Sequence, residues 1–149
     1  MSSPATVQVA LQHFAETDPC IHAVCESAFA NDNPPLLPSP KPVEQYFPTL
    51  VNSVVSQQIS TKAAAAIYKR LSDTVTLTPD GVQVATEEMI KSCGVTKQKT
   101  RYIKRLAEAW KALQVETFVD CSDAEVITRL SACYGIGRWT AEMFLLFAM

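Results

Sequence analysis

The chain has 149 residues, enough for one domain that buries a hydrophobic core of useful size. Its formal net charge of −2 at pH 7 excludes a basic tail and any protein that attracts nucleic acid through bulk positive charge. Hydrophobic residues make up 48% of the chain and charged residues 19%, a balance that excludes intrinsic disorder. Glycine occurs only four times, so few tight turns are expected and a helical protein is favoured.

The five cysteines predict free thiols rather than a metal site. Their number is odd, their spacing is irregular and no Cys-x-x-Cys pair occurs, whereas zinc and iron–sulfur sites need clustered ligands. The first residues lack the basic and apolar regions of a signal peptide, and no apolar run approaches the roughly 20 residues that span a membrane. We therefore expect a protein of the cytoplasm (nucleoid) or the nucleus, neither secreted nor membrane-bound, with reduced thiols.

Two helix starts mark a predicted N-terminal helical arm, residues 1–30. Ser3-Pro4 and Asp18-Pro19 each place a capping side chain before a proline, the residue favoured at the first helical position. Apolar residues at helical spacing follow each start. Residues 31–42 then hold five of the nine prolines. Because proline fixes φ and lacks a backbone donor, we expect an extended connector there.

The remaining body, residues 43–149, is predicted to be a succession of helices. Helical periodicity and capping residues favour helices over residues 43–55, Thr61 to about Leu71, two short segments from Thr78 and Thr86, and Thr96 to about Gln114. The first two would form a helical hairpin around the polar break at 56–60. Only residues 74–77 favour a strand, and four residues do not make a sheet. We therefore predict an all-α fold.

The most informative motif is Gly135-Ile136-Gly137, which contains half of the glycines in the chain. A helix opened by the capping box from Ser122 to Glu125 precedes it, and a helix that begins at Arg138 follows. A two-glycine turn between helices leaves unpaired backbone N–H groups at a helix N-terminus, where an anion can bind. The alternative is an ordinary helix C-cap with a flexible turn, but the capped helix before it and the basic start after it favour the anion site.

The segment from Tyr134 to Glu142 resembles the helix-hairpin-helix of the DNA glycosylase superfamily. Residues 47–64 are similar to the early helical hairpin of that family, and residues 94–107 to its middle segment, in the same order. The matching type is the 3-methyladenine DNA glycosylase II, or alkyl-base glycosylase, type. The resemblance implies the helix-hairpin-helix DNA glycosylase fold, with the helix-hairpin-helix at about residues 122–149.

The resemblance also implies contacts between the helix-hairpin-helix and DNA. Backbone amides at three positions would bind a DNA phosphate: Gly135, Gly137 and Thr140. Ile136, between the glycines, is also counted among the DNA-binding residues. Three backbone carbonyls would hold a monovalent cation, Na⁺ or K⁺, between the helix-hairpin-helix and that phosphate: Ser131, Cys133 and Ile136. No other cofactor is required by the family chemistry.

Further positions carry over to the base pocket and the DNA strand. Trp139 would form an aromatic wall of the pocket, and Met143 lies one turn further on. Gln58 would fill the gap left by the extruded base, with Gln57 as the neighbouring alternative and a buried polar role as the other possibility for both. Lys97 and Lys99 belong to a run of seven cationic residues and one carboxylate between positions 91 and 111. They would contact phosphates, or the run would simply form a solvated helix face.

The implied function is base excision repair of double-stranded DNA. A DNA glycosylase of this type flips an alkylated purine, such as 3-methyladenine or 7-methylguanine, out of the duplex and hydrolyses its N-glycosidic bond. The cationic base leaves readily and would be recognised by stacking on electron-rich rings. The family aspartate, which stabilises an oxocarbenium-like sugar, is expected beyond Met149, and no aspartate follows Asp123.

We therefore expect a truncated glycosylase whose C-terminal part is missing and whose 149 residues lack activity by themselves. The complete protein would be a monomer. Two alternatives stay open: a non-enzymatic helix-hairpin-helix module that binds DNA without cleaving it, and a degenerate relic with no independent activity.

Overall fold

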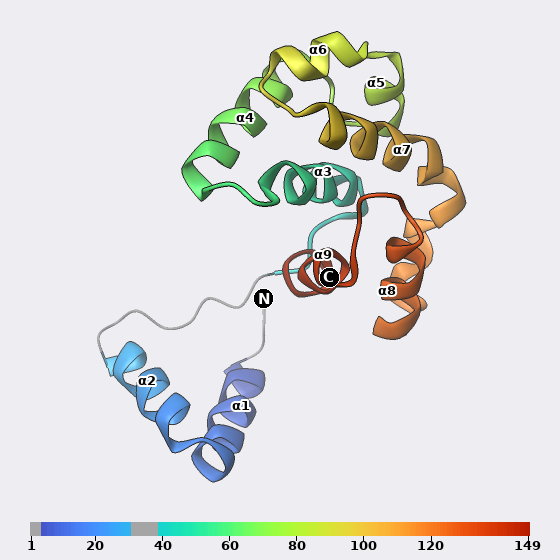
Figure 1. Ribbon diagram of the computed structural model, residues 1–149. Helices are drawn as coiled ribbons and strands as arrows, with labels where there is room; N and C mark the ends of the chain where they lie inside the picture. The colour runs from blue at the N-terminus through green and yellow to red at the C-terminus, as the bar shows by residue number, and fades with distance from the viewer. Residues whose placement is uncertain (1–3, 31–38) are drawn as a thin grey trace. The chain divides into compact units, whose positions relative to one another are not determined.

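The computed structural model describes residues 4–30 and 39–149, which form helices and connecting turns with no strand among them (Figure 1). The all-α prediction is confirmed. The chain divides into two compact units, Met1–Pro40 and Lys41–Met149. Ser3, expected to cap the first helix, and residues 31–38 of the expected connector lie outside the described residues.

The first unit contains α1 (Pro4–Thr17) and α2 (Pro19–Ala30), which pack against each other. Asp18 lies between the two helices in the sequence. Its carboxylate caps α2 and accepts hydrogen bonds from the backbone N–H groups of Cys20 and Ile21, both at 3.1 Å. This is the N-cap that the Asp-Pro pair predicts. No described side chain of these two helices is fully buried.

The second unit holds the hydrophobic core. Its elements are η1 (Val43–Gln45), α3 (Tyr46–Ser56), α4 (Thr61–Thr74), α5 (Pro79–Val84), α6 (Glu87–Ser92), α7 (Lys97–Leu113), η2 (Val115–Asp120), α8 (Asp123–Ser131) and α9 (Arg138–Ala148). These bounds agree with the predicted ones to within three residues. The 3₁₀ helix η2 is the exception, because no sequence signal indicates it. It follows Gln114, which ends α7 in the left-handed conformation at φ 49°.

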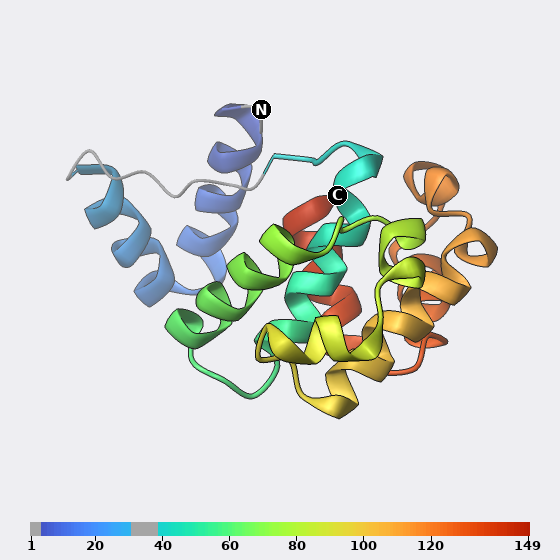
Figure 2. The ribbon, with the colours of Figure 1, turned by 90° about the horizontal axis from the view of Figure 1, so that it is seen from above.

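Helix α3 lies at the centre of the second unit and contacts α4, α7 and α9 (Figures 1 and 2). Its apolar side chains point to more than one side, and Leu50, Val51 and Val54 are completely buried. A short helix that is apolar on several faces gains stability only when neighbours cover it. The position of α3 therefore follows from its composition.

Aromatic contacts attach α9 to the rest of the core. Phe144, fully buried, packs edge-on against Tyr46 of α3, with ring centroids 5.0 Å apart, and against Phe118 of η2 at 6.3 Å. Such edge-to-face pairs contribute about 0.5–1.5 kcal/mol beyond the apolar area that they bury. They hold the helix-hairpin-helix, which includes α9, against the central helix.

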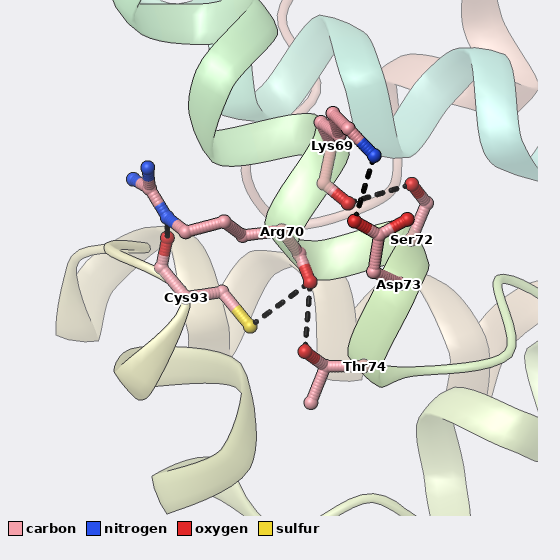
Figure 3. A network of polar contacts seen from close by, with 6 residues as sticks. All are labelled: Lys69, Arg70, Ser72, Asp73, Thr74 and Cys93. Carbon is pink, nitrogen blue, oxygen red and sulfur yellow. Dashed lines mark hydrogen bonds and ion pairs between the residues drawn. The ribbon is translucent and has the colours of Figure 1, made fainter.

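Cationic side chains cap the C-terminal ends of neighbouring helices. Figure 3 shows Arg70 of α4, whose Nε donates to the carbonyl of Cys93, the C-cap of α6, at 2.9 Å. Lys104 of α7 donates to the carbonyls of Val82, Gln83 and Ala85 at the end of α5. The last carbonyls of a helix lack intrahelical donors and carry a partial negative charge, so a cation stabilises them.

The predicted capping box is present at the start of α8. The Ser122 hydroxyl accepts from the Glu125 N–H at 3.4 Å, and the Glu125 carboxylate accepts from the Ser122 N–H at 2.8 Å. These hydrogen bonds also hold the pKa of Glu125 below its ordinary value, the bond from the Ser122 backbone having the largest effect.

We expect Ser122→Ala to lower the free energy of unfolding by about 1 kcal/mol, because the N–H group of Glu125 then loses its side-chain acceptor. Urea denaturation followed by circular dichroism measures the change. Ser131→Ala, at an exposed position on the same helix, is the control and should shift stability by less than about 0.5 kcal/mol. Equal effects of the two substitutions would contradict a role for the cap.

Candidate nucleic-acid interface

The helix-hairpin-helix joins α8 to α9 through the turn at residues 132–137. Ile136, between the two glycines, is only 3% exposed, so its side chain anchors the turn in the core. The Ile136 N–H donates to the carbonyl of Cys133 at 3.0 Å, which closes the turn. Gly137 then takes the N-cap position of α9 in an extended conformation. The turn is therefore well packed on its inner side.

The two glycines of the turn serve different structural needs. Gly135 has φ +95°, and a Cβ there would lie 2.6 Å or less from three carbons of the Tyr102 side chain. Gly137 has an ordinary φ of −87°, and a Cβ there would meet no atom within 4 Å. Internal packing thus requires a glycine at 135 but not at 137. The open space in front of Gly137 lets another molecule approach the backbone closely.

The N-terminus of α9 has the features of an anion site. No side chain caps it, and its first intrahelical hydrogen bond runs from the Ala141 N–H to the Gly137 carbonyl. The N–H groups before Ala141 therefore have no acceptor within the helix, and the helix dipole adds positive potential there. No acidic residue occupies the first turn, and the Arg138 guanidinium donates to Glu142 at 2.7 Å.

The predicted phosphate-binding positions lie together at this end of α9. The backbone of Gly135, Ile136 and Gly137 forms the turn, and Thr140 follows in the first turn of α9 as a buried residue with 4% of its area exposed. That these groups bind DNA stays a prediction.

The predicted cation site rests on three backbone carbonyls, one at the end of α8 and two in the turn at 132–137. The carbonyl oxygen of Cys133 already accepts one hydrogen bond, from Ile136, and retains a second lone pair. Neutral oxygens of this kind suit a hard cation. That the carbonyls of Ser131, Cys133 and Ile136 together hold Na⁺ or K⁺ stays a prediction. In the part of the chain that the structure describes, no three His, Cys, Asp or Glu side chains gather as they would around a metal ion.

Trp139 lies on the surface of α9, with 65% of its area exposed, and Met143 is half-buried one turn later. Leu146 and Phe147, both exposed, continue the same stripe at helical spacing. No aromatic ring among the described residues stacks on Trp139. The indole face is therefore available for a flat, cationic partner.

The structure distinguishes the two neighbouring glutamines of the α3–α4 turn. Gln58 is exposed and adopts the left-handed conformation, with φ 57°. The Gln57 side chain is half-buried, and its Nε2 donates to the carbonyl of Gly135 at 3.1 Å. Gln57 thus has the internal polar role, while the side chain of Gln58 is free to contact DNA. Sequence reasoning missed the positive φ, since nothing around Gln58 resembles a glycine turn.

The two predicted phosphate-contacting lysines have different environments. Lys97 is exposed at the start of α7. Lys99 instead turns its ammonium into the protein, where Nζ donates to the carbonyls of Val55 at 2.8 Å and Gln57 at 2.7 Å. Partial burial lowers the pKa of Lys99. In this structure the charge of Lys99 caps the end of α3. That Lys99 contacts a phosphate stays a prediction.

Other cationic side chains of the basic run at 91–111 also have partners within the chain. Lys104 donates to backbone carbonyls, whereas Lys91 and Arg105 form exposed ion pairs with Glu88 and Glu108. A charge count along the sequence does not show whether a lysine faces solvent or a helix end. The run is therefore a weaker guide to DNA than the turn at 132–137.

Sequence reasoning also missed Tyr102. Its ring lies against Gly135 and packs edge-on against Tyr134, with centroids 5.1 Å apart and planes at 82°. Only the packing of α7 against the turn reveals this contact, because the residues are more than thirty positions apart.

The family model and the relatives that match this chain agree with each other. The model of the HhH-GPD superfamily base excision DNA repair protein matches residues 51–143. The chain is 35% identical over 107 residues to the DNA-3-methyladenine glycosylase 1 of Schizosaccharomyces pombe, covering 67% of this chain and 47% of that protein. It is 30% identical to the DNA-3-methyladenine glycosylase of Saccharomyces cerevisiae, covering 93% and 51%. The chain thus spans about half the length of these relatives.

Solved structures show the same likeness. A DNA-3-methyladenine glycosidase from Bacillus halodurans superposes with a TM-score of 0.67 at 35% identity, covering 76% of this chain and 53% of the other. A 3-methyladenine DNA glycosylase from Schizosaccharomyces pombe in complex with abasic DNA gives a TM-score of 0.66 at 35% identity, covering 76% and 58%.

Among residues 4–30 and 39–149, no helix is long and apolar enough to cross a membrane.

Proposed function

The chain belongs to the HhH-GPD superfamily of base excision DNA repair proteins, and we propose that it recognises alkylated purines in double-stranded DNA. The relatives that support this choice of lesion are DNA-3-methyladenine glycosylases at 35% and 30% identity. The chain spans about half of the length of these relatives. We propose that its residues bind the DNA and open the duplex.

The observation that carries the proposal is the open, uncapped N-terminus of α9 at Gly137. A phosphate oxygen could accept from the unpaired N–H groups there, and no side chain obstructs its approach. A cation held by the neighbouring carbonyls would add positive charge beside the phosphate. Binding through backbone amides also suits a chain whose net charge is −2.

Recognition of the lesion would use Trp139. An alkylated purine carries positive charge, and the exposed indole offers a cation–π contact of about 0.5–2 kcal/mol. Extruding the base from the duplex costs a few kcal/mol, and Gln58, exposed at the α3–α4 turn, would occupy the vacated space. Lys97 would add a phosphate contact.

Hydrolysis needs a carboxylate to stabilise the developing positive charge of the sugar. In α9, the carboxylate of Glu142 accepts from Arg138 at 2.7 Å, so it is engaged on the helix surface. We therefore propose that the 149 residues bind the lesion without excising it. This pairing also favours the second candidate function, a DNA-binding module that does not cleave.

A duplex oligonucleotide containing one 7-methylguanine tests both parts of the proposal. We expect fluorescence anisotropy to show binding that weakens with salt, and chromatography to show no released base above the protein-free control. Absence of binding even at low salt would contradict the proposed function. Release of 7-methylguanine would contradict the binding-only role and would identify a catalytic group within these residues.

We expect Gln58→Gly to reduce the preference for a duplex with an abasic-site analogue over an intact duplex by about fivefold or more, the scale of one lost contact to a base. Stability should stay equal or rise by up to about 1 kcal/mol, because glycine accepts φ 57° without strain. Anisotropy and thermal unfolding measure the two quantities. An unchanged preference would exclude Gln58 from the DNA interface.

A further inference from the structure

We propose that Gln57 and Lys99 are positioning residues that hold Gln58 at a fixed place relative to the phosphate-binding N-terminus of α9. The inference rests on the proposed function and adds a coupling to it. Phosphate binding at the helix-hairpin-helix and insertion of Gln58 into the duplex would then occur as one event. Three contacts carry the argument.

The first contact joins the two segments directly. Gln57 Nε2 donates to the carbonyl of Gly135 at 3.1 Å, across 78 residues of sequence. Gly135 belongs to the turn that precedes α9, and Gln57 immediately precedes Gln58. The hydrogen bond is part-buried, so water competes with it less than at the surface. The α3–α4 turn and the turn at 132–137 are thus tied at the residues next to their proposed DNA contacts.

The second contact fixes the peptide before Gln58. Lys99 Nζ donates to the Gln57 carbonyl at 2.7 Å and to the Val55 carbonyl at 2.8 Å. The Gln57 carbonyl belongs to the peptide bond that joins Gln57 to Gln58, so its orientation sets the backbone at Gln58. A left-handed conformation is costly for a residue with a Cβ and persists only where its surroundings hold it. The two hydrogen bonds from Lys99 hold the backbone at Gln58 in this conformation.

The third contact makes α7 a common support. Tyr102, one turn after Lys99, lies against Gly135, and the ring of Tyr134 packs on it. Helix α7 therefore touches the α3–α4 turn through Lys99 and the turn at 132–137 through Tyr102. One rigid helix fixes the distance between the two proposed DNA contacts.

The test measures binding of the full chain to two duplexes, one intact and one with a tetrahydrofuran abasic-site analogue, over a series of salt concentrations. We expect Gln57→Ala and Lys99→Met each to lower the preference for the abasic duplex by about fivefold, the effect of one lost hydrogen bond. The slope of affinity against salt should stay unchanged. Lys99→Arg, which can still donate to two carbonyls, should restore the preference.

Two comparisons separate positioning from other roles. Lys97→Met removes an exposed cation from the same helix and should lower the salt slope by about one on both duplexes alike. In a Gln58→Gly background, Gln57→Ala should cause no further loss of preference, since a residue that acts through Gln58 has nothing left to position. Gln57→Met, which keeps the side-chain length and adds no charge, replaces Gln57→Ala if the latter unfolds.

Each contrary result has a distinct meaning. A fall of the salt slope in Lys99→Met, like that in Lys97→Met, would make Lys99 a phosphate contact and overturn the inference. The inference would also be overturned, while the proposed function stands, if Gln57→Ala kept the wild-type preference for the abasic duplex. A lower preference in the Gln57→Ala/Gln58→Gly variant than in Gln58→Gly alone would have the same meaning. If the wild-type chain binds neither duplex at low salt, the proposed function itself fails.

Discussion

Gly135→Ala is expected to lower the free energy of unfolding by about 2–5 kcal/mol. Two costs add: a residue with a Cβ at this positive φ costs about 1–2 kcal/mol, and forcing an atom into a packed site costs about 1–3 kcal/mol. The new methyl group would lie 2.6 Å or less from three carbons of Tyr102, which is itself packed against Tyr134. Urea denaturation followed by circular dichroism gives the value.

Gly94→Ala is the matched control, because Gly94 has the same φ of +95°. Its Cβ would come closest to the end of the flexible Arg70 side chain, at 2.9 Å, and would otherwise be in ordinary contact with Ile67 at 3.4 Å or more. The control should therefore show the backbone cost of about 1–2 kcal/mol alone. If both variants lose the same stability, the contact with Tyr102 is not what requires a glycine at 135.

Gly137→Asp is expected to weaken DNA binding more than about 100-fold and to leave stability within a few tenths of a kcal/mol. Aspartate is a favoured N-cap residue, and the extended conformation of Gly137 suits it, so its carboxylate would accept from the free N–H groups of α9. The same carboxylate would face the incoming phosphate, and like charges in contact cost several kcal/mol. Anisotropy with the abasic duplex and thermal unfolding measure the two effects.

Gly137→Asn separates the effect of the negative charge from the effect of a side chain that fills the space at the N-terminus of α9. Asparagine has nearly the same shape and also caps a helix, but it carries no charge. We expect it to bind DNA more weakly than the wild type and more tightly than Gly137→Asp. Wild-type affinity in Gly137→Asp would place the DNA phosphate elsewhere and remove the main support for the proposed function. Together, Gly135→Ala and Gly137→Asp would show that folding requires the first glycine of the turn and that DNA binding requires the second.

The starts of the helices can be predicted from local sequence signals. The side chains of Thr78, Thr86, Thr96 and Ser122 each accept a hydrogen bond from the backbone N–H three residues later, as their positions predict. These interactions connect residues within one turn of helix, so each can be recognised without knowledge of the fold. The all-α class follows from the same local signals. The two-glycine turn was likewise recognisable, because its glycines and flanking helices are contiguous.

Which polar residues face outward depends instead on contacts between distant parts of the chain. Lys97 and Lys99 are equivalent in a charge count, yet Lys99 caps the end of α3 through contacts across 42 and 44 residues. Gln57 and Gln58 are adjacent and chemically identical, yet Gln57 bonds to Gly135 across 78 residues. Such partners are brought together by the packing of α3, α7 and the turn at 132–137, and packing depends on the whole core. Local patterns therefore determined the helices, while long-range contacts determined which side chains remain available for DNA.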